Sequence, residues 1–198
     1  MGAARDARLA IWLVGLSGAG KSAIAQAIAA EFAQRARPVL VLDGDELRDG
    51  LNADLGFGRA DRLEAARRTA AVSVQVASAG VVAVTAMITP YRRSRTAARA
   101  AHEAAGVAFF EVWVATPIEV CVARDRKGLY AAARRGQLTG MTGIDDPFEE
   151  PEDPDCVVDA SSTPAVALAR GVLSALPDAR RVAALASAPS GRRAGRPR

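Results

Sequence analysis

The sequence predicts an α/β fold, in which helices cover both faces of a parallel sheet of about five strands. Short continuous apolar runs alternate with longer helical patterns along most of the 198 residues, as in strands joined by right-handed helical crossovers. Glycine-rich and acidic segments follow several of the predicted strands. Because ligands bind at the carboxyl ends of the strands in such folds, we expect the functional residues at that edge of the sheet.

Five apolar runs are predicted to form the strands. The first, Leu9–Val14, is apolar throughout and leads into a glycine, which is typical of a strand buried on both faces. The others are predicted at Val39–Leu42, Val81–Met87, Val107–Val114 and Cys156–Asp159. Helices are predicted between them at Lys21–Gln34, about Arg62–Ala79, Arg92–Ala105, from Thr116 and Pro117 onward, and at Pro164–Leu176. Residues 126–154, rich in Gly, Pro and charge, are expected to form a long mobile segment.

Composition excludes several classes of protein. Half of the residues are hydrophobic and 24% are charged, so the chain can bury a core. Two cysteines are too few for a disulfide framework. The uncharged stretch between Arg68 and Arg92 is interrupted by polar residues and by Gly80, so a helix followed by a buried strand is favoured over a membrane span. Because the first residues also show no signal peptide pattern, a cytoplasmic location is expected.

The net charge of +4 is concentrated at one end of the chain. Residues 178–198 hold six Arg and one Asp and sum to +5, so residues 1–177 sum to −1. We therefore predict a single domain over residues 1–177 and a basic, disordered tail over residues 178–198. Since the basicity belongs to the tail, nucleic acid is not an expected partner of the domain, although weak phosphate or partner binding by the tail is an alternative.

A glycine-rich loop follows the first predicted strand. The segment Gly15-Leu-Ser-Gly-Ala-Gly-Lys-Ser22 matches the pattern G-x-x-x-x-G-K-[ST] and precedes a predicted helix, which is the context that this motif requires. Lys21 would neutralise the β- and γ-phosphates of a nucleoside triphosphate, and the Ser22 hydroxyl would coordinate Mg²⁺. The backbone N–H groups that would cradle the phosphates belong to Gly15, Leu16, Ser17, Gly18, Ala19 and Gly20. The motif predicts a three-layer sandwich of the P-loop NTPase type.

A small-molecule kinase fits the rest of the chain better than a GTPase. A GTPase would show an Asn-Lys-x-Asp-like element after a later strand, and no lysine is available for it. A kinase needs an acceptor site and a lid that excludes water, and residues 126–154 supply a candidate lid. Asp43 and Asp45 follow the second predicted strand, where either could hold the water shell of the metal or accept a proton from an attacking hydroxyl. Asp-Gly-Asp is also common in ordinary turns.

Beyond these two segments, the sequence resembles the adenylylsulfate kinases, P-loop kinases that transfer the γ-phosphate of ATP to the 3′-hydroxyl of adenosine 5′-phosphosulfate (APS). The resemblance runs from Ile11 to about Pro154. It is carried further by Gly50-Leu-Asn-x-Asp-Leu-Gly-Phe57, Ile88-Thr-Pro-Tyr-Arg92, Lys127-Gly-Leu-Tyr130 and Thr142-Gly-Ile-Asp-Asp-Pro147. It implies an enzyme of sulfate activation that uses ATP and Mg²⁺ to make 3′-phosphoadenosine 5′-phosphosulfate. Because family members commonly form dimers, it also implies a homodimer.

The resemblance implies roles for individual residues on the acceptor side. Arg48 and Arg62 would grip the phosphosulfate end of the acceptor, a task suited to guanidinium groups. Phe57 would pack near the acceptor base, with plain core packing as the alternative. Asp45 would lie beside the metal and the attacking hydroxyl as a catalytic residue and metal ligand with Ser22, and Asp43 would support it.

Further implied roles fall on the loop after the third strand and on the lid. Ile88 and Thr89 would contact the acceptor, and Thr89 replaces a serine of the family that is sometimes described as phosphorylated, so it keeps the hydroxyl. The lid would comprise residues 126–148. Lys127 would lie near the phosphates, with a surface turn as the alternative, and Met141 would line the acceptor site.

Three positions depart from the family pattern. Ala65 follows Glu64 where an Asn is usual, and Thr139 and Met141 stand where a Lys and a base-stacking Phe are usual. Loss of an aromatic stack costs about 1–3 kcal/mol, and a missing hydrogen bond costs roughly 1 kcal/mol more. The departures predict weakened binding of APS, or an acceptor that is a different activated nucleotide of secondary or surface-polymer metabolism. A non-catalytic ATP-binding regulator is a third alternative.

Overall fold

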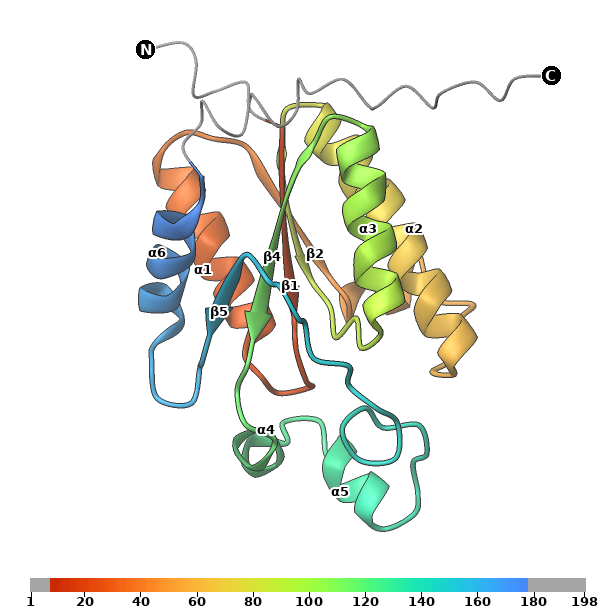
Figure 1. Cartoon of the computed structure of the whole chain (residues 1–198). Helices are drawn as coiled ribbons and strands as arrows, with labels where there is room; N and C mark the ends of the chain where they lie inside the picture. The colour runs from red at the N-terminus through yellow and green to blue at the C-terminus, as the bar shows by residue number, and fades with distance from the viewer. Residues whose placement is uncertain (1–7, 178–198) are drawn as a thin grey trace, which may run out of the picture.

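The computed structural model describes residues 8–177 and has the α/β fold that the sequence predicts. Five strands form one parallel sheet in the order β2-β3-β1-β4-β5 (Figure 1). The strands are β1 (Leu9–Val14), β2 (Val39–Asp43), β3 (Val82–Ala86), β4 (Ala108–Val114) and β5 (Cys156–Val158). The predicted tail, residues 178–198, lies outside the described residues.

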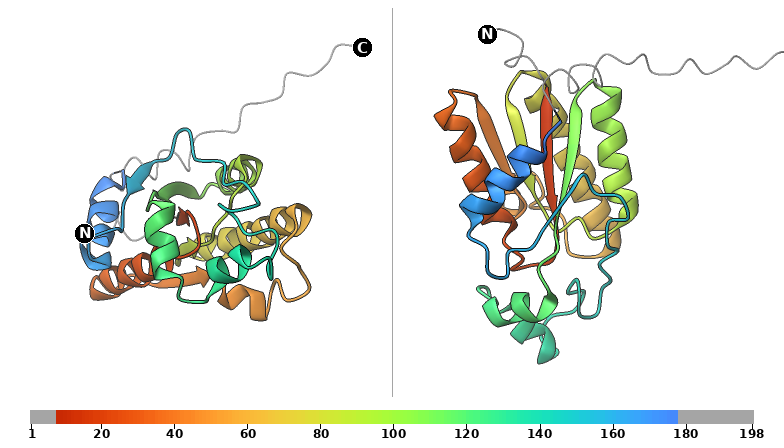
Figure 2. Two further views of the ribbon diagram at one scale, coloured as in Figure 1. Left: turned by 90° about the horizontal axis from the view of Figure 1, so that it is seen from below. Right: turned by 60° about the vertical axis from the view of Figure 1, so that its left-hand side comes forward.

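Helices cover both faces of the sheet, which gives three layers. Figure 2 shows α1 (Lys21–Gln34) and α6 (Ala165–Ala175) together on one face, and α2 (Arg59–Ser78) and α3 (Arg92–Ala104) on the other. The short helices α4 (Ile118–Arg124) and α5 (Leu129–Arg134) lie beyond the carboxyl ends of the strands (Figure 1).

The central strand β1 explains why both layers form. All six of its residues are buried, and alternate side chains point to opposite faces of the sheet. Ile11 and Leu13 pack in the core beneath α1 and α6. Trp12 packs in the second core beneath α2 and α3, against the Phe109 ring of β4. The phosphate loop therefore leaves the sheet from its most buried strand.

The sequence prediction was wrong or incomplete at a few boundaries. Helix α2 begins at Arg59 rather than at about Arg62, because Gly58 still adopts an extended conformation. Two short elements were not predicted. They are the 3₁₀-helix η1 (Glu46–Asp49) and helix α5, and α5 lies inside the segment that was expected to be mobile. The Asp125 carboxylate caps α5 by accepting the N–H groups of its second and third residues at 3.1 and 2.9 Å.

The uncharged stretch before Arg92 divides as predicted. It contributes the carboxyl half of α2 and the whole of β3, whose five residues are all buried. Within residues 8–177, no helix is long and apolar enough to cross a membrane.

Candidate active site

A cavity of about 940 Å³ lies at the carboxyl ends of the strands. Its walls come from the phosphate loop, the segments after β2 and β3, the start of α2 and the lid. Among the residues predicted for the site, those that line it are Ser17, Gly18, Gly20, Lys21, Ser22, Asp43, Asp45, Arg48, Phe57, Arg62, Ile88, Thr89, Lys127 and Met141. The fold therefore gathers the predicted donor and acceptor residues around one space.

Three predicted loop residues do not line the cavity and instead support the shape of the loop. Gly15 has a φ of 146°, and a Cβ there would lie 2.5 Å from the carbonyl oxygen of Val114, so only glycine fits. The carbonyl of Leu16 accepts the N–H of Ala19, whose own carbonyl accepts the hydroxyl of Thr116. These contacts hold the loop against the ends of β4 and α4.

Lys21 is buried and bonded to the loop that carries it. Its Nζ donates to the carbonyls of Gly15 at 3.0 Å and Leu16 at 2.7 Å. Burial lowers the pKa of the Lys21 ammonium to about 8, although the nearby carboxylates of Asp45 and Asp43 act in the opposite direction. The charge predicted to meet the phosphates is thus held in place at the first residue of α1.

Oxygen donors suited to Mg²⁺ face the same space. Ser22 is exposed beside Lys21, and Asp43 and Asp45 lie at the end of β2. Asp43 is buried, and its Oδ1 accepts the backbone N–H of Asp45 at 2.9 Å, which fixes the carboxylate. A hydroxyl and two carboxylates on one wall are the ligand types that Mg²⁺ prefers, so these residues fit the predicted metal.

An ion pair connects Lys127, in the predicted lid, with Asp45 on another part of the cavity wall. The Nζ of Lys127 lies 2.5 Å from Oδ2 of Asp45, and both side chains are more than half exposed. Lys127 lies in an exposed turn, as the alternative from the sequence had it, and its side chain also lines the cavity. Exposed pairs of this kind contribute little to stability, about 0–1 kcal/mol, so ligands can replace the contact at small cost.

Two guanidinium groups and an aromatic ring form the acceptor wall. Phe57 is 58% exposed, which contradicts the core-packing alternative. The Cζ atoms of Arg48 and Arg62 lie 4.4 and 5.9 Å from the centre of its ring, in the range of cation–π contacts. Arg48 also donates to the carbonyls of Leu55 and Gly56, which orders the loop that presents the ring.

Arg62 joins this wall to the lid. It donates to the carbonyls of Phe57 at 2.8 Å and Gly140 at 2.7 Å, and it lies 3.7 Å from the carboxylate of Asp146. In the same lid turn, Asp145 accepts the N–H groups of Gly140 and Met141. Those two hydrogen bonds lower the pKa of Asp145, so the turn is held by an ionised carboxylate.

Thr89 occupies an unusual conformation at the end of β3. Its φ is 42°, a region that β-branched residues rarely adopt. The indole N–H of Trp12 donates to its hydroxyl at 3.1 Å, and Arg95 donates to its carbonyl at 3.0 Å. Thr89 lines the cavity although it is only 3% exposed.

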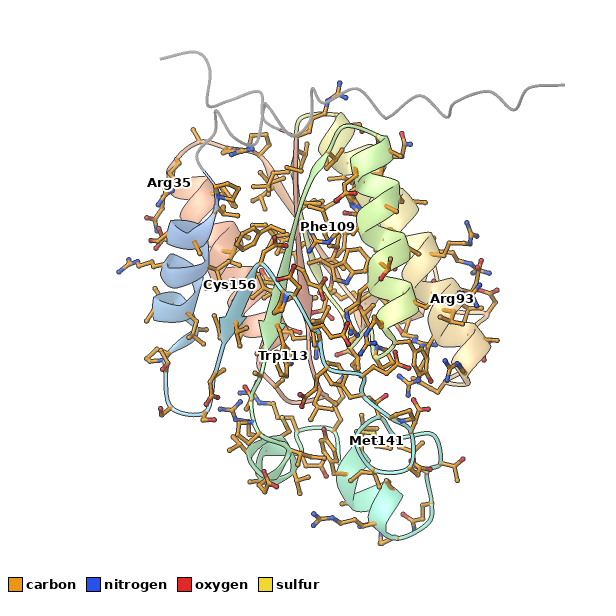
Figure 3. All side chains as sticks on the ribbon, in the orientation of Figure 1. Arg35, Arg93, Phe109, Trp113, Met141 and Cys156 are labelled. Carbon is orange, nitrogen blue, oxygen red and sulfur yellow. The ribbon has the colours of Figure 1, made fainter. Side chains whose placement is uncertain are left out.

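The three departures from the family pattern all lie on the cavity wall. Ala65 is 1% exposed on α2, and Met141 is 5% exposed in the lid (Figure 3), where it also contacts the core. Thr139 lies beside it on the exposed rim. Substitutions at these positions therefore change the shape of the cavity itself.

Several residues that line the cavity were not predicted as site residues from the sequence. Tyr130 is buried, and its hydroxyl donates to the carbonyl of Ser17 at 2.9 Å, so it joins α5 to the phosphate loop. Burial raises the pKa of Tyr130, which keeps the phenol protonated as a donor. Arg124 donates to the carbonyls of Gly18 and Ala160. Tyr130 falls in a segment that carried the family resemblance, which was the available signal, and Arg124 lies just before that segment.

The geometry defines a class of protein. A phosphate loop with its buried lysine, two carboxylates at the next strand end, paired arginines and a lid together make a nucleotide-dependent small-molecule kinase. The family model for adenylylsulphate kinase matches residues 7–159. The chain belongs to the adenylylsulfate kinase family.

Individual relatives agree with this assignment. The adenylyl-sulfate kinase of Paraburkholderia xenovorans strain LB400 is 49% identical over 164 residues, which cover 83% of this chain and 89% of that protein. The adenylyl-sulfate kinase of Lactiplantibacillus plantarum is 48% identical over 84% of this chain and 79% of that protein. The Mycobacterium tuberculosis APS kinase CysC, solved in complex with AMPPNP and APS, superposes with a TM-score of 0.82 at 42% identity, covering 84% of this chain and 95% of that one.

Proposed function

We propose that this chain transfers the γ-phosphate of ATP to the 3′-hydroxyl of APS, giving ADP and 3′-phosphoadenosine 5′-phosphosulfate. The observation that carries the proposal is the single cavity shared by the phosphate loop, the two carboxylates and the arginine–phenylalanine wall, in a member of this family. Such a cavity brings donor and acceptor together, which lowers the barrier to an in-line transfer.

Each wall of the cavity would contribute a different part of the reaction. Lys21 and the loop N–H groups would hold the phosphates and stabilise the charge that spreads over the transferring group. Arg48 and Arg62 would bind the phosphosulfate, with Phe57 against the adenine. Asp45, supported by Asp43, would orient the attacking hydroxyl and accept its proton.

Mg²⁺ and the lid complete the proposed mechanism. Ser22 and Asp45 would hold Mg²⁺, directly or through water, and the ion would supply positive charge at the phosphate oxygens. The lid, residues 126–148, would exclude water so that ATP is not hydrolysed, with Lys127 turning from Asp45 to the phosphates. Thr89 would donate its free hydroxyl hydrogen to the acceptor, with Ile88 beside it. A cytoplasmic location and a homodimer belong to the same proposal.

A second candidate is a kinase of this family that acts on a different activated nucleotide. It is favoured by Ala65, Thr139 and Met141, because all three line the cavity and each replaces a larger or more polar family side chain.

The test is ADP release by the purified protein with ATP and Mg²⁺, measured with and without micromolar APS. Release that depends on APS, with the product phosphorylated at the 3′ position, is the expected result. Lys21→Ala should abolish transfer while the fold survives, and turnover within about tenfold of wild type would contradict its role. ATP binding without APS-dependent release would favour the second candidate and call for other activated nucleotides as acceptors.

A further inference from the structure

Arg95 is a buried arginine that lies outside the cavity and yet contacts two of its boundaries. It belongs to the first turn of α3 and is 3% exposed. Its Nη1 donates to the carbonyl of Thr89 at 3.0 Å, and its Nη2 donates to the carbonyl of Glu149 at 2.6 Å. One guanidinium group therefore joins the loop after β3 to the residue that follows the lid.

Glu149 is attached to the same loop by its other polar groups. Its backbone N–H donates to the carbonyl of Pro90 at 2.8 Å, and its carboxylate accepts the N–H of Arg92 at 2.7 Å. Nearby, the Tyr91 hydroxyl donates to the carboxylate of Asp146 at about 2.9 Å. The carboxyl end of the lid and the Thr89 loop consequently form one hydrogen-bonded unit, with Arg95 at its buried side.

The Thr89 backbone needs such support. A left-handed conformation at a β-branched residue is strained and persists only where the surroundings enforce it. Trp12 holds the side chain of Thr89, whereas Arg95 holds its carbonyl. Without the guanidinium, the peptide group after Thr89 would be free to rotate, and the threonine would leave the cavity wall.

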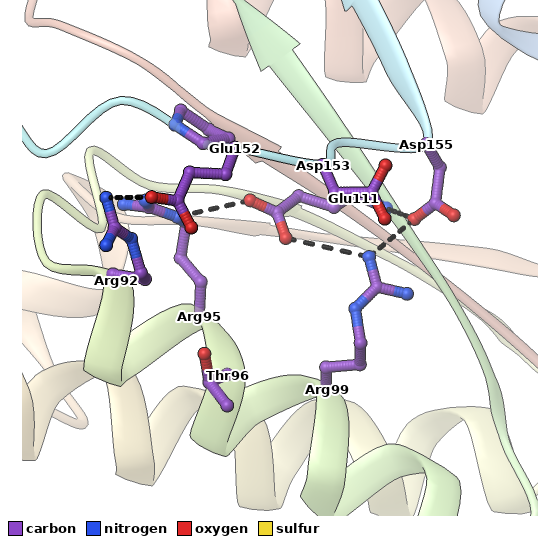
Figure 4. Close-up of a pocket in the computed structure, with 9 residues that line it drawn as sticks. Arg92, Arg95, Thr96, Arg99, Glu111, Glu152, Asp153 and Asp155 are labelled. Atoms are coloured by element: carbon purple, nitrogen blue, oxygen red, sulfur yellow. Dashed lines mark hydrogen bonds and ion pairs between the residues drawn. The ribbon is translucent and has the colours of Figure 1, made fainter.

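The charge of Arg95 is balanced on the opposite side. Its Nε lies 3.2 Å from Oε1 of Glu111 on β4, and Arg99 lies 3.6 Å from the other oxygen of the same carboxylate. Figure 4 shows both arginines on α3 facing Glu111 across a small charged cavity. A buried ion pair is seldom more stable than an apolar pair of equal size, so stability alone does not account for an arginine here.

We propose that Arg95 is a positioning residue for phosphoryl transfer, which keeps Thr89 on the cavity wall and fixes the end of the lid relative to it. The inference rests on the proposed function, in which Thr89 contacts the acceptor. It predicts an effect on the acceptor side of the reaction and little on ATP binding, because the carbonyls that Arg95 contacts belong to Thr89 and Glu149 and its remaining partner is Glu111.

The chain supplies a matched control for the test. Arg99 shares the helix and the Glu111 partner, but its own further contacts are with Asp155 at 2.7 Å and with the Phe109 carbonyl and ring of β4. We would compare Arg95→Lys, Arg95→Ala and Arg99→Ala as full-length proteins. Arg95→Lys keeps the charge in the fold, although one ammonium group cannot donate in the fixed fork that reaches both carbonyls.

Both Arg95 variants should lose on the order of 100-fold in kcat/KM for APS, through a higher KM and a lower kcat. Their affinity for a non-hydrolysable ATP analogue should change less than about threefold, and Arg99→Ala should stay within about threefold in all parameters. Added guanidinium, below the concentration that unfolds the protein, should restore part of the Arg95→Ala activity, whereas equal sodium chloride should not.

Equal losses in a folded Arg95→Lys protein and in Arg99→Ala would overturn the proposal, since both would then act through Glu111. Hydrogen exchange of the ligand-free protein tests the positioning role of Arg95 independently of the proposed kinase activity, because it needs no acceptor. The Glu149 amide should exchange faster in both Arg95 variants than in Arg99→Ala, whatever the acceptor is. Unchanged Glu149 exchange in the Arg95 variants would overturn the positioning role even if wild-type protein proves inactive with APS.

Discussion

Single residues on the cavity wall are expected to affect how the acceptor base is held. Ala65 and Met141 lie on that wall, nearly buried, with the open cavity beside them. A longer side chain at either position would change the lining of the cavity. The family's usual Asn and Phe at these two positions are therefore expected to alter how an acceptor fits.

We predict that Ala65→Asn combined with Met141→Phe tightens APS binding. The aromatic ring would stack on the base, a contact of about 1–3 kcal/mol, so the KM for APS should fall about tenfold. Steady-state ADP release at saturating ATP measures the effect. Met141→Leu, which is apolar but not aromatic, is the control and should leave the KM near its wild-type value. An unchanged KM in the double variant would mean that the departures do not weaken acceptor binding.

The positions of individual residues could be predicted from the sequence where a motif fixes the local backbone. The phosphate loop and the Asp-Gly-Asp segment each follow a strand, so their positions follow from the fold. Arg95 and Tyr130 were missed because their partners, Thr89, Glu149 and Ser17, are 6 to 113 residues away in the chain. No local pattern distinguishes such an arginine from the exposed ones beside it.

At the scale of elements, helices α2 and α3 are joined by a buried histidine. His102 is fully buried on α3, where its Nδ1 donates to the carbonyl of Ala98 at 2.7 Å. The Nε2 therefore accepts the hydroxyl of Ser73 on α2 at 2.8 Å in the neutral ring. Burial lowers the pKa of His102 from its ordinary value of 6.5, so the folded protein favours the uncharged form.

Lowering the pH should reduce the stability that this buried histidine gives to the protein. Above about pH 6.5 the histidine is neutral in both folded and unfolded chains, and its stabilising effect is complete. As the pH falls below about 6.5, the unfolded chain takes up a proton that the folded protein resists, so the free energy of unfolding decreases. Urea unfolding at about pH 7.5 and about pH 5.5 should therefore show that the advantage of wild type over His102→Gln is smaller at the lower pH. An advantage that is the same at both pH values would contradict this prediction.

Elements with a clear apolar run or helix-start signal were predictable, including the three-residue β5 and the seven-residue α4, whereas η1 and α5 were not. The five strands and the four long helices follow from apolar runs and helical spacing, with boundary errors of a few residues. Helix α5 has six residues, too few to be stable alone. It forms because Asp125 caps it and Tyr130 anchors it to the phosphate loop, which are tertiary contacts that a local pattern does not contain.

At the scale of the whole molecule, the net charge divides unevenly along the sequence. Residues 1–177 sum to −1 and residues 178–198 to +5. Among the described residues, 8–177, the lining of the cavity runs from Ser17 to Ala165. The strand order, which places β1 at the centre, could not be read from the sequence, because pairing between strands depends on long-range packing.

We predict that deletion of residues 178–198 leaves kcat and both KM values within about twofold of those of the full chain. The same deletion should reduce retention on a cation-exchange resin at low salt, since it removes the net positive charge. Loss of activity in the shortened protein would show that the tail takes part in the reaction.

The hydrogen bonds of Lys21 to its own loop affect which anions the loop selects. Any anion that enters must take the ammonium away from the carbonyls of Gly15 and Leu16, as well as lose its own hydration shell. A triphosphate replaces those bonds with several oxygens and adds the contacts of its base and ribose. Inorganic phosphate or sulfate supplies fewer oxygens and neither base nor ribose, so we expect the loop to bind a free anion more weakly than a nucleoside triphosphate.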